Sequence, residues 1–79
     1  LANLHNIDAE VFEYEVQKGA KVTAKPIKDL RFPREAVFGG IIRNEKAIMP
    51  SGDIQITAGD KVIIFCLPEI ISTVERLFK

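Results

Sequence analysis

The chain has 79 residues and a mass of 8.8 kDa, which is enough for one small domain and too little for two independent hydrophobic cores. Eleven Lys and Arg residues balance eleven Asp and Glu residues, so the net charge argues against nucleic acid or an anionic membrane as the main partner. A single cysteine and a single histidine exclude an internal disulfide and a Cys/His zinc cluster. So small a core favours a partner as a source of added stability.

The leading segment, 1–9, shows no clean hydrophobic period and is predicted to be a linker or the end of a preceding segment. The chain starts at Leu1 and lacks the regions of a signal peptide, which favours a piece cut from a longer intracellular protein. The longest apolar run, 62–67, has six residues, whereas a membrane-spanning helix needs about 20. We therefore expect no membrane span.

Alternating polar and apolar residues predict a first strand over 10–17, with aromatic side chains on one face and carboxylates on the other. Thr23 and Pro26 predict a short helix over 24–30, because Thr23 can cap it and Pro26 is tolerated in its first turn.

The segment 36–44 predicts a second strand that is interrupted by Gly39 and Gly40. Paired glycines weaken a strand, so they predict either a β-bulge or a place where another backbone or a ligand approaches closely. A turn at 44–45 is expected to lead into a strand over 46–50.

Two turns that contain a Gly-Asp pair predict a strand over 54–56 and another over 61–67. The continuous apolar run of the latter predicts a central strand covered on both faces, with Phe65 and Cys66 in the core. From Pro68 onward, apolar residues recur at helical spacing and predict a docked terminal helix. The order β-α-β-β-β-β-α predicts an α+β fold, a two-layer sandwich of a mostly antiparallel sheet with a short helix and a C-terminal helix.

Few residues could carry catalysis. Cys66 lies in an apolar strand and His5 in the leading segment, which argues against a nucleophile–base pair. Asp53 and Asp60 each follow a glycine in a tight turn, where an aspartate bonds its own backbone. The chain also lacks the glycine-rich loops that bind nucleotide phosphates. We therefore predict no catalytic residue, no metal site and no enzymatic activity.

Charge is balanced overall but not locally. Six Lys and Arg residues occur within 18–34 against only Asp29, and an acidic segment over 8–15 precedes them. The basic segment either attracts a phosphate-bearing ligand or an acidic neighbour, or is a solvated face screened by the acidic strand. Arg43 ends an otherwise apolar strand, where it either points outward at the rim or reaches a carboxylate or phosphate across an interface.

Four motifs follow one another in a fixed order along 10–79. They are Lys21-Val22-Thr23-Ala24-Lys25-Pro26, Gly39-Gly40-Ile41-Ile42-Arg43, Pro50-Ser51-Gly52-Asp53 and Gly59-Asp60-Lys61-Val62. In this order they resemble the regulator-of-potassium-conductance C-terminal domain, also called the TrkA-C domain. The ending Leu77-Phe78-Lys79 is similar to that of the last such domain in regulatory proteins of Trk potassium uptake systems.

The resemblance implies a non-enzymatic regulatory domain that controls a membrane potassium-transporter subunit by a conformational shift, in the cytoplasm and peripheral to the inner face of the cell membrane. It implies no cofactor here, with NAD or ATP expected only in a preceding N-terminal domain of the parent protein, and no nucleic acid polymer as a partner. Some relatives bind a cyclic dinucleotide or another effector at the interface between two such domains. By motif position, the expected ligand-binding residues are Ile42, Arg43, Asn44 and Pro50.

A homodimer is also expected, with Val37, Gly39, Gly40 and Ile41 in its interface. The small core, the glycine pair and the resemblance to a family whose domains pair all favour it. Two other functions stay open: a small-metabolite sensor of the amino-acid-binding type attached to an enzyme, and a dimerisation module without a ligand.

Overall fold

The computed structural model describes residues 9–79, so the predicted linker, with His5, lies outside the described residues except for Ala9. The elements are β1 (Glu10–Glu15), η1 (Lys21–Thr23), η2 (Ile27–Asp29), β2 (Ala36–Arg43), β3 (Lys46–Ile48), β4 (Lys61–Cys66), η3 (Pro68–Ile70) and α1 (Ile71–Leu77), where η marks a 3₁₀ turn. The four strands form one antiparallel sheet in the order β1-β4-β2-β3. The predicted α+β architecture is confirmed.

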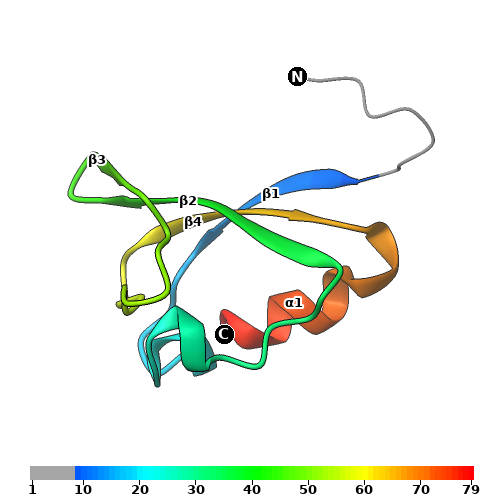
Figure 1. Ribbon diagram of the computed structural model, residues 1–79, viewed down its shortest axis with the longest axis horizontal. Coiled ribbons are helices and arrows are strands. Elements are labelled where there is room, and N and C mark those ends of the chain that lie inside the picture. The colour runs from blue at the N-terminus through cyan, green and yellow to red at the C-terminus, as the bar shows by residue number, and fades with distance from the viewer. Residues whose placement is uncertain (1–8) are drawn as a thin grey trace.

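The sheet forms one layer, and α1 with the three 3₁₀ turns forms the other (Figure 1). The face of the sheet that meets this second layer is called the inner face here, and the opposite face the outer face. Strand alternation places Val62, Ile64 and Cys66 of β4 on the inner face, all nearly inaccessible to solvent. The core therefore lies between the sheet and the helical layer.

The predicted terminal helix is present as η3 followed by α1, and Pro68 occupies the first turn of η3. Val74 of α1 and Phe78 just beyond it are buried against the inner face. The ring of Phe78 stacks on that of Tyr14 from β1, with centroids 4.8 Å apart. This helix closes the core, as its apolar spacing predicts.

The predicted helix over 24–30 is wrong, because only the single 3₁₀ turn η2 forms within this segment, and η1 ends just before it. Pro26 is extended, with φ −56° and ψ 154°, and this conformation separates the turns. The Thr23 hydroxyl donates a hydrogen bond back to the Ala20 carbonyl (2.7 Å), so it does not cap a following helix.

The predicted strand over 54–56 is also wrong, although its side chains alternate between half-buried or buried and exposed as a strand would. Its backbone pairs with none of the described strands. The Ile54 carbonyl accepts a hydrogen bond from the Ile27 N–H (2.9 Å), and the Gln55 carbonyl accepts one from Arg43 Nη2 (2.9 Å). The segment is an extended strap that ties η2 to the end of β2.

β4 is the central strand that the sequence predicts, but the described part of the chain covers only its inner face. Cys66 is 1% exposed, whereas Phe65 is 37% exposed on the outer face. The prediction that Phe65 lies in the core is therefore wrong for this chain by itself. The apolar run marks a strand whose second face is left without a cover from the described elements.

Candidate functional site

The outer face carries apolar side chains that the described residues leave in solvent. Val37 of β2 is 60% exposed and Val11 of β1 is 43% exposed, and each pairs with Phe65 of β4 across the sheet. All described helical elements lie on the opposite face (Figure 1). Apolar sheet faces of this kind are normally buried against a further layer.

This face is hollowed where β2 meets β3. The hollow has a volume of about 270 Å³ and is lined by apolar residues, namely Gly39, Gly40, Ile41, Ile42, Ala47, Ile48, Met49 and Ile63. The Met49 side chain at its rim is 83% exposed. The hollow therefore offers an apolar surface and few polar partners to a ligand.

The glycine pair produces the predicted β-bulge. Phe38 pairs with Ile64 and Gly40 with Ile63, so Gly39 is the additional residue on β2. A Cβ atom at Gly39 would collide with the ring of Phe65, whereas a Cβ atom at Gly40 would meet no atom within 4 Å. Gly39 thus makes room for a ring of its own chain, and Gly40 leaves open space on the outer face.

Arg43 lies on the inner face, two residues beyond the buried Ile41, and forms a bidentate ion pair with Asp60. Arg43 Nε donates to Asp60 Oδ1 (2.9 Å) and Nη2 donates to Oδ2 (2.8 Å). The carboxylate also accepts the Thr57 N–H (2.9 Å), as its place in a turn predicts. The carboxylate that Arg43 reaches therefore belongs to its own chain, an arrangement that the sequence analysis does not include.

Burial makes this ion pair asymmetric. Asp60 is 2% exposed, whereas the Arg43 side chain is 31% exposed and also donates to the Gln55 carbonyl. The hydrogen bonds from Arg43, helped by the Thr57 N–H, hold the pKa of the Asp60 carboxyl below its usual value against the opposing effect of burial. The same hydrogen bonds raise the pKa of Arg43. The pair anchors the end of β2 to the turn before β4.

The four predicted ligand residues do not converge in one cavity of this chain. Ile42 lines the outer hollow, while Arg43 faces the other side of the sheet. Asn44 lies in the turn between β2 and β3 with a positive φ of 50°, as does Glu45 with 65°, which is the geometry of a type I′ turn. Pro50 is half-buried and directly follows the rim residue Met49.

The predicted interface residues divide in a similar way. Val37, Gly39 and Gly40 are accessible on the outer face. Ile41 contributes its backbone to β2, but its side chain is 1% exposed and belongs to the core. A second chain on this face would therefore meet the first three residues and not the Ile41 side chain.

Reactive groups are sparse among the described residues. Within 9–79, no three His, Cys, Asp or Glu side chains gather closely enough to hold a metal ion. Burial raises the pKa of the Cys66 thiol, which keeps it protonated and a poor nucleophile at neutral pH. Over the same range, no helix has the length and apolar character needed to cross a membrane. Gly39 and Gly40 lie inside a strand and open no helix at which a nucleotide phosphate could bind.

One antiparallel sheet with helical elements on one face defines an α+β domain. A solved structure described as an RCK domain with cda shares this fold with a TM-score of 0.74, at 23% identity over 87% of this chain and 97% of that one. A model of the TrkA-C domain family matches residues 11–79. The chain therefore belongs to the TrkA-C domain family, as its motif order indicates.

Curated relatives are named as Trk system potassium uptake proteins. The chain is 35% identical, over 79 residues, to the Trk system potassium uptake protein TrkA homolog 2 of Methanosarcina mazei, covering 100% of the chain and 18% of that relative. It is 31% identical, over 70 residues, to the Trk system potassium uptake protein TrkA of Azorhizobium caulinodans, covering 89% of the chain and 15% of that relative. The chain thus spans less than a fifth of the length of these two proteins.

Proposed function

We propose that this domain is a non-enzymatic regulatory module of a Trk-type potassium uptake system and pairs with a second copy of itself through the outer face of its sheet. The observation that carries the proposal is the apolar face around Val37 and Phe65, which the described residues leave uncovered, in a chain of the TrkA-C family. Pairing would remove these side chains from water, which would stabilise the dimer by about 25 cal/mol for each Å² of apolar surface buried.

The hollow beside β3 supports a shared effector site. Its volume of about 270 Å³ lies below the roughly 300–1,000 Å³ that is usual for a pocket around a drug-sized ligand, so one chain offers only part of a site for an effector as large as a cyclic dinucleotide. A two-fold axis would bring a second hollow to face the first. Ile42 and Asn44 of the β2–β3 hairpin, and Pro50 just after β3, would border this shared site. Arg43 faces the inner side, so its part would be to anchor the end of β2 through Asp60 and the Gln55 carbonyl.

The proposed effector is a small molecule such as a cyclic dinucleotide, whose two-fold symmetry matches that of the dimer. A ligand that binds one arrangement of the pair more tightly shifts the population toward it, and by no more than its differential affinity. The membrane transporter subunit would read that shift through the rest of the parent protein, at the cytoplasmic face of the membrane. NAD or ATP would bind to a preceding domain, since this chain lacks a phosphate-binding loop.

Sedimentation equilibrium tests the pairing. We expect a mass of about twice 8.8 kDa for the 79-residue chain at high micromolar concentration. The Gly40→Phe substitution should shift it toward monomer, because its Cβ atom meets no atom of its own chain within 4 Å and its ring would occupy the outer hollow that the partner approaches. Ser72→Phe on α1, exposed in the other layer, is the matched control and should stay dimeric. A monomeric parent chain would rule out the pairing.

Thermal shift separates the proposed effector from the open alternatives. A cyclic dinucleotide at 100 times its dissociation constant should stabilise the domain by about 2.7 kcal/mol. Stabilisation by free amino acids instead would favour the metabolite-sensor alternative. A stable dimer that no nucleotide or amino acid stabilises would favour a dimerisation module without a ligand.

A further inference from the structure

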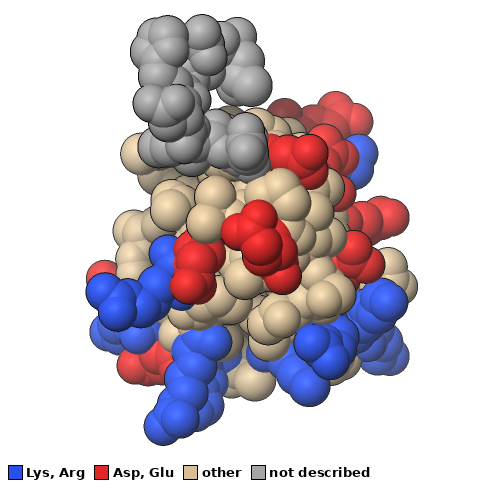
Figure 2. Space-filling model, turned by 90° about the vertical axis from the view of Figure 1, so that its right-hand side faces the viewer, with Lys and Arg blue, Asp and Glu red and all other residues tan. Residues whose placement is uncertain are grey.

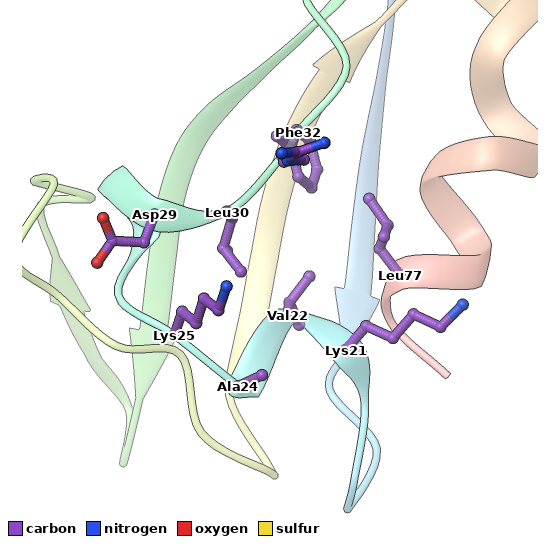
Figure 3. A pocket seen from close by; sticks show the side chains of 9 residues that line it. Lys21, Val22, Ala24, Lys25, Asp29, Leu30, Phe32 and Leu77 are labelled. Atoms are coloured by element: carbon purple, nitrogen blue, oxygen red, sulfur yellow. The ribbon is translucent and has the colours of Figure 1, made fainter.

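A second cavity, of about 220 Å³, opens in the helical layer and shares no lining residue with the outer hollow. Its apolar floor is formed by side chains from three separate segments: Val22 of η1, Leu30 and Phe32 after η2, and Leu77 of α1 (Figure 3). These segments meet where the two 3₁₀ turns pack beside the terminal helix. The cavity is therefore a feature of the tertiary fold and not of one loop.

The core holds this floor in place. Val22 is 1% exposed and belongs to the buried core, which fixes its position. The Phe32 ring packs on that of Phe38, with centroids 4.5 Å apart, and meets the Phe78 ring edge-on at 6.2 Å. A floor that is already ordered costs little conformational entropy when a ligand binds.

The rim of the cavity is basic. Lys21, Lys25 and Arg31 line it together with one carboxylate, that of Asp29, which points away from Val22, Phe32 and Leu77 in Figure 3. None of these three cations forms an ion pair with a carboxylate among residues 9–79. They are exposed, so they can turn toward a bound anion.

This rim belongs to a wider basic end of the domain. Figure 2 views the domain from the side opposite η1 and η2, and there too most Lys and Arg side chains gather along the lower edge. Of the six cations in the basic segment, only Lys28 has an ion-pair partner among the described residues, Asp53 at 3.0 Å and on the surface. The acidic strand β1 therefore leaves the cations of the rim available to a ligand.

We propose that this cavity binds a small phosphate monoester whose organic part is a ring-sized apolar group. The apolar group would cover the floor of Val22, Leu30, Phe32 and Leu77. Three cations against one carboxylate leave a net charge of two on the rim, which matches a phosphate monoester with a charge of about −1.5 to −2 at neutral pH. Because the cations are exposed and flexible, selection here would depend on charge and apolar contact more than on fixed hydrogen-bond geometry.

The site is independent of the proposed pairing. None of its lining residues lies on the outer face, so loss of the dimer would leave this cavity unchanged, and failure to bind here would not affect the dimer. If both proposals hold, the domain has two effector sites on opposite layers, and each could change the affinity of the other.

An NMR titration of the isotopically labelled 79-residue chain with phenyl phosphate tests the proposal. We expect saturable shifts of the Val22, Leu30 and Leu77 amides with a dissociation constant of about 1 mM, as befits a ligand of so few atoms. Phenol, benzoate and inorganic phosphate, titrated separately, should each bind at least about tenfold more weakly than phenyl phosphate. The proposal fails if phenyl phosphate gives no saturable shift there, or if any of the other three binds as tightly.

Charge-reversal variants provide the second arm. The double substitution Lys21→Glu with Lys25→Glu should weaken phenyl phosphate binding about tenfold or more. The matched pair Lys18→Glu with Arg34→Glu changes net charge equally but lies outside the lining of the cavity, and it should weaken binding about twofold or less. All four positions are exposed, so both variants should retain dispersed native spectra. Equal weakening in both would show general electrostatic attraction and overturn the site.

Discussion

Removing either partner of the Arg43–Asp60 ion pair should destabilise the domain, but by unequal amounts. Arg43→Met leaves a carboxylate that is 2% exposed without its cation, whereas Asp60→Asn leaves a guanidinium that is 31% exposed and keeps its bond to the Gln55 carbonyl. Water can replace the lost partner only for the arginine. We therefore expect Arg43→Met to be the more damaging substitution.

The magnitudes follow from the number of hydrogen bonds and their burial. Breaking a buried pair by removing one partner costs about 3–5 kcal/mol, which is the expectation for Arg43→Met at pH 7. Asp60→Asn keeps one oxygen that can accept from Arg43 or Thr57 but loses the second charged acceptor, so we expect about 1.5–3 kcal/mol. A domain of 79 residues has a total stability of roughly 4–12 kcal/mol, so the larger loss approaches unfolding.

Urea denaturation of the two single variants and of the double variant closes the thermodynamic cycle. The double variant should cost less than the sum of the singles by about 1.5–3 kcal/mol, because the second substitution removes the charge that the first leaves unpaired. Equal costs for the two single variants would refute the argument from burial. A coupling energy below about 0.5 kcal/mol would refute the interaction itself.

The same pair gives the stability a dependence on acid. Arg43 lowers the pKa of folded Asp60 from its unfolded value of about 3.9, so the contribution is present in full above that value and is lost as the pH falls through the lower folded pKa. The parent chain should therefore lose stability more steeply below about pH 4 than Asp60→Asn does. Parallel profiles for the two proteins between pH 5 and pH 2 would show that Asp60 does not carry this dependence.

Three further predictions test the packing. Gly39→Ala should lower the free energy of unfolding by about 1–3 kcal/mol through the collision with Phe65, and this loss should vanish in a Phe65→Ala background. Gly40→Ala should change the free energy of unfolding in urea by less than about 0.5 kcal/mol. An equal effect at both glycines would contradict the collision. The Tyr14 hydroxyl is buried without a partner among the described residues, so Tyr14→Phe should raise the unfolding free energy by up to about 1 kcal/mol, and a loss would reveal a partner. The Cys66 thiol should react with a disulfide reagent only as fast as the domain unfolds, and rapid labelling of the native protein would refute its burial.

Local patterns predict much of this fold because the relevant forces are local. The alternation in β1, the apolar run of β4 and the helical spacing after Pro68 each require only that one face of an element meet the core. The bulge in β2 is likewise visible in the glycine pair. The predicted helix over 24–30 and the predicted strand over 54–56 fail for a physical reason. The Ile27 N–H donates to the Ile54 carbonyl and the Gln55 side chain donates to the Thr23 carbonyl, and no local pattern contains those distant partners.

The Arg43–Asp60 pair shows where sequence reasoning about a site ends. Asp60 is recognisable as a turn residue, and Arg43 as an unusual cation at the end of an apolar strand. The two residues are 17 positions apart in the chain. They come into contact only because the β2–β3 hairpin and the strap bring the chain back to the end of β2. A lone buried-turn aspartate and a lone strand-end arginine were the only available signal, and together they could have suggested the pairing.

The outer face shows a different relation between sequence and structure. The run 62–67 has the composition of a strand buried on both sides, yet the described chain buries only alternate residues and leaves Phe65 37% exposed. Keeping Val37 and Val11 beside it in water has no benefit for a monomer, and it creates a surface prone to association. The apolar run is therefore typical of a strand whose outer face is covered by a further layer. In the proposed dimer the second copy, approaching across Gly40, would supply that layer.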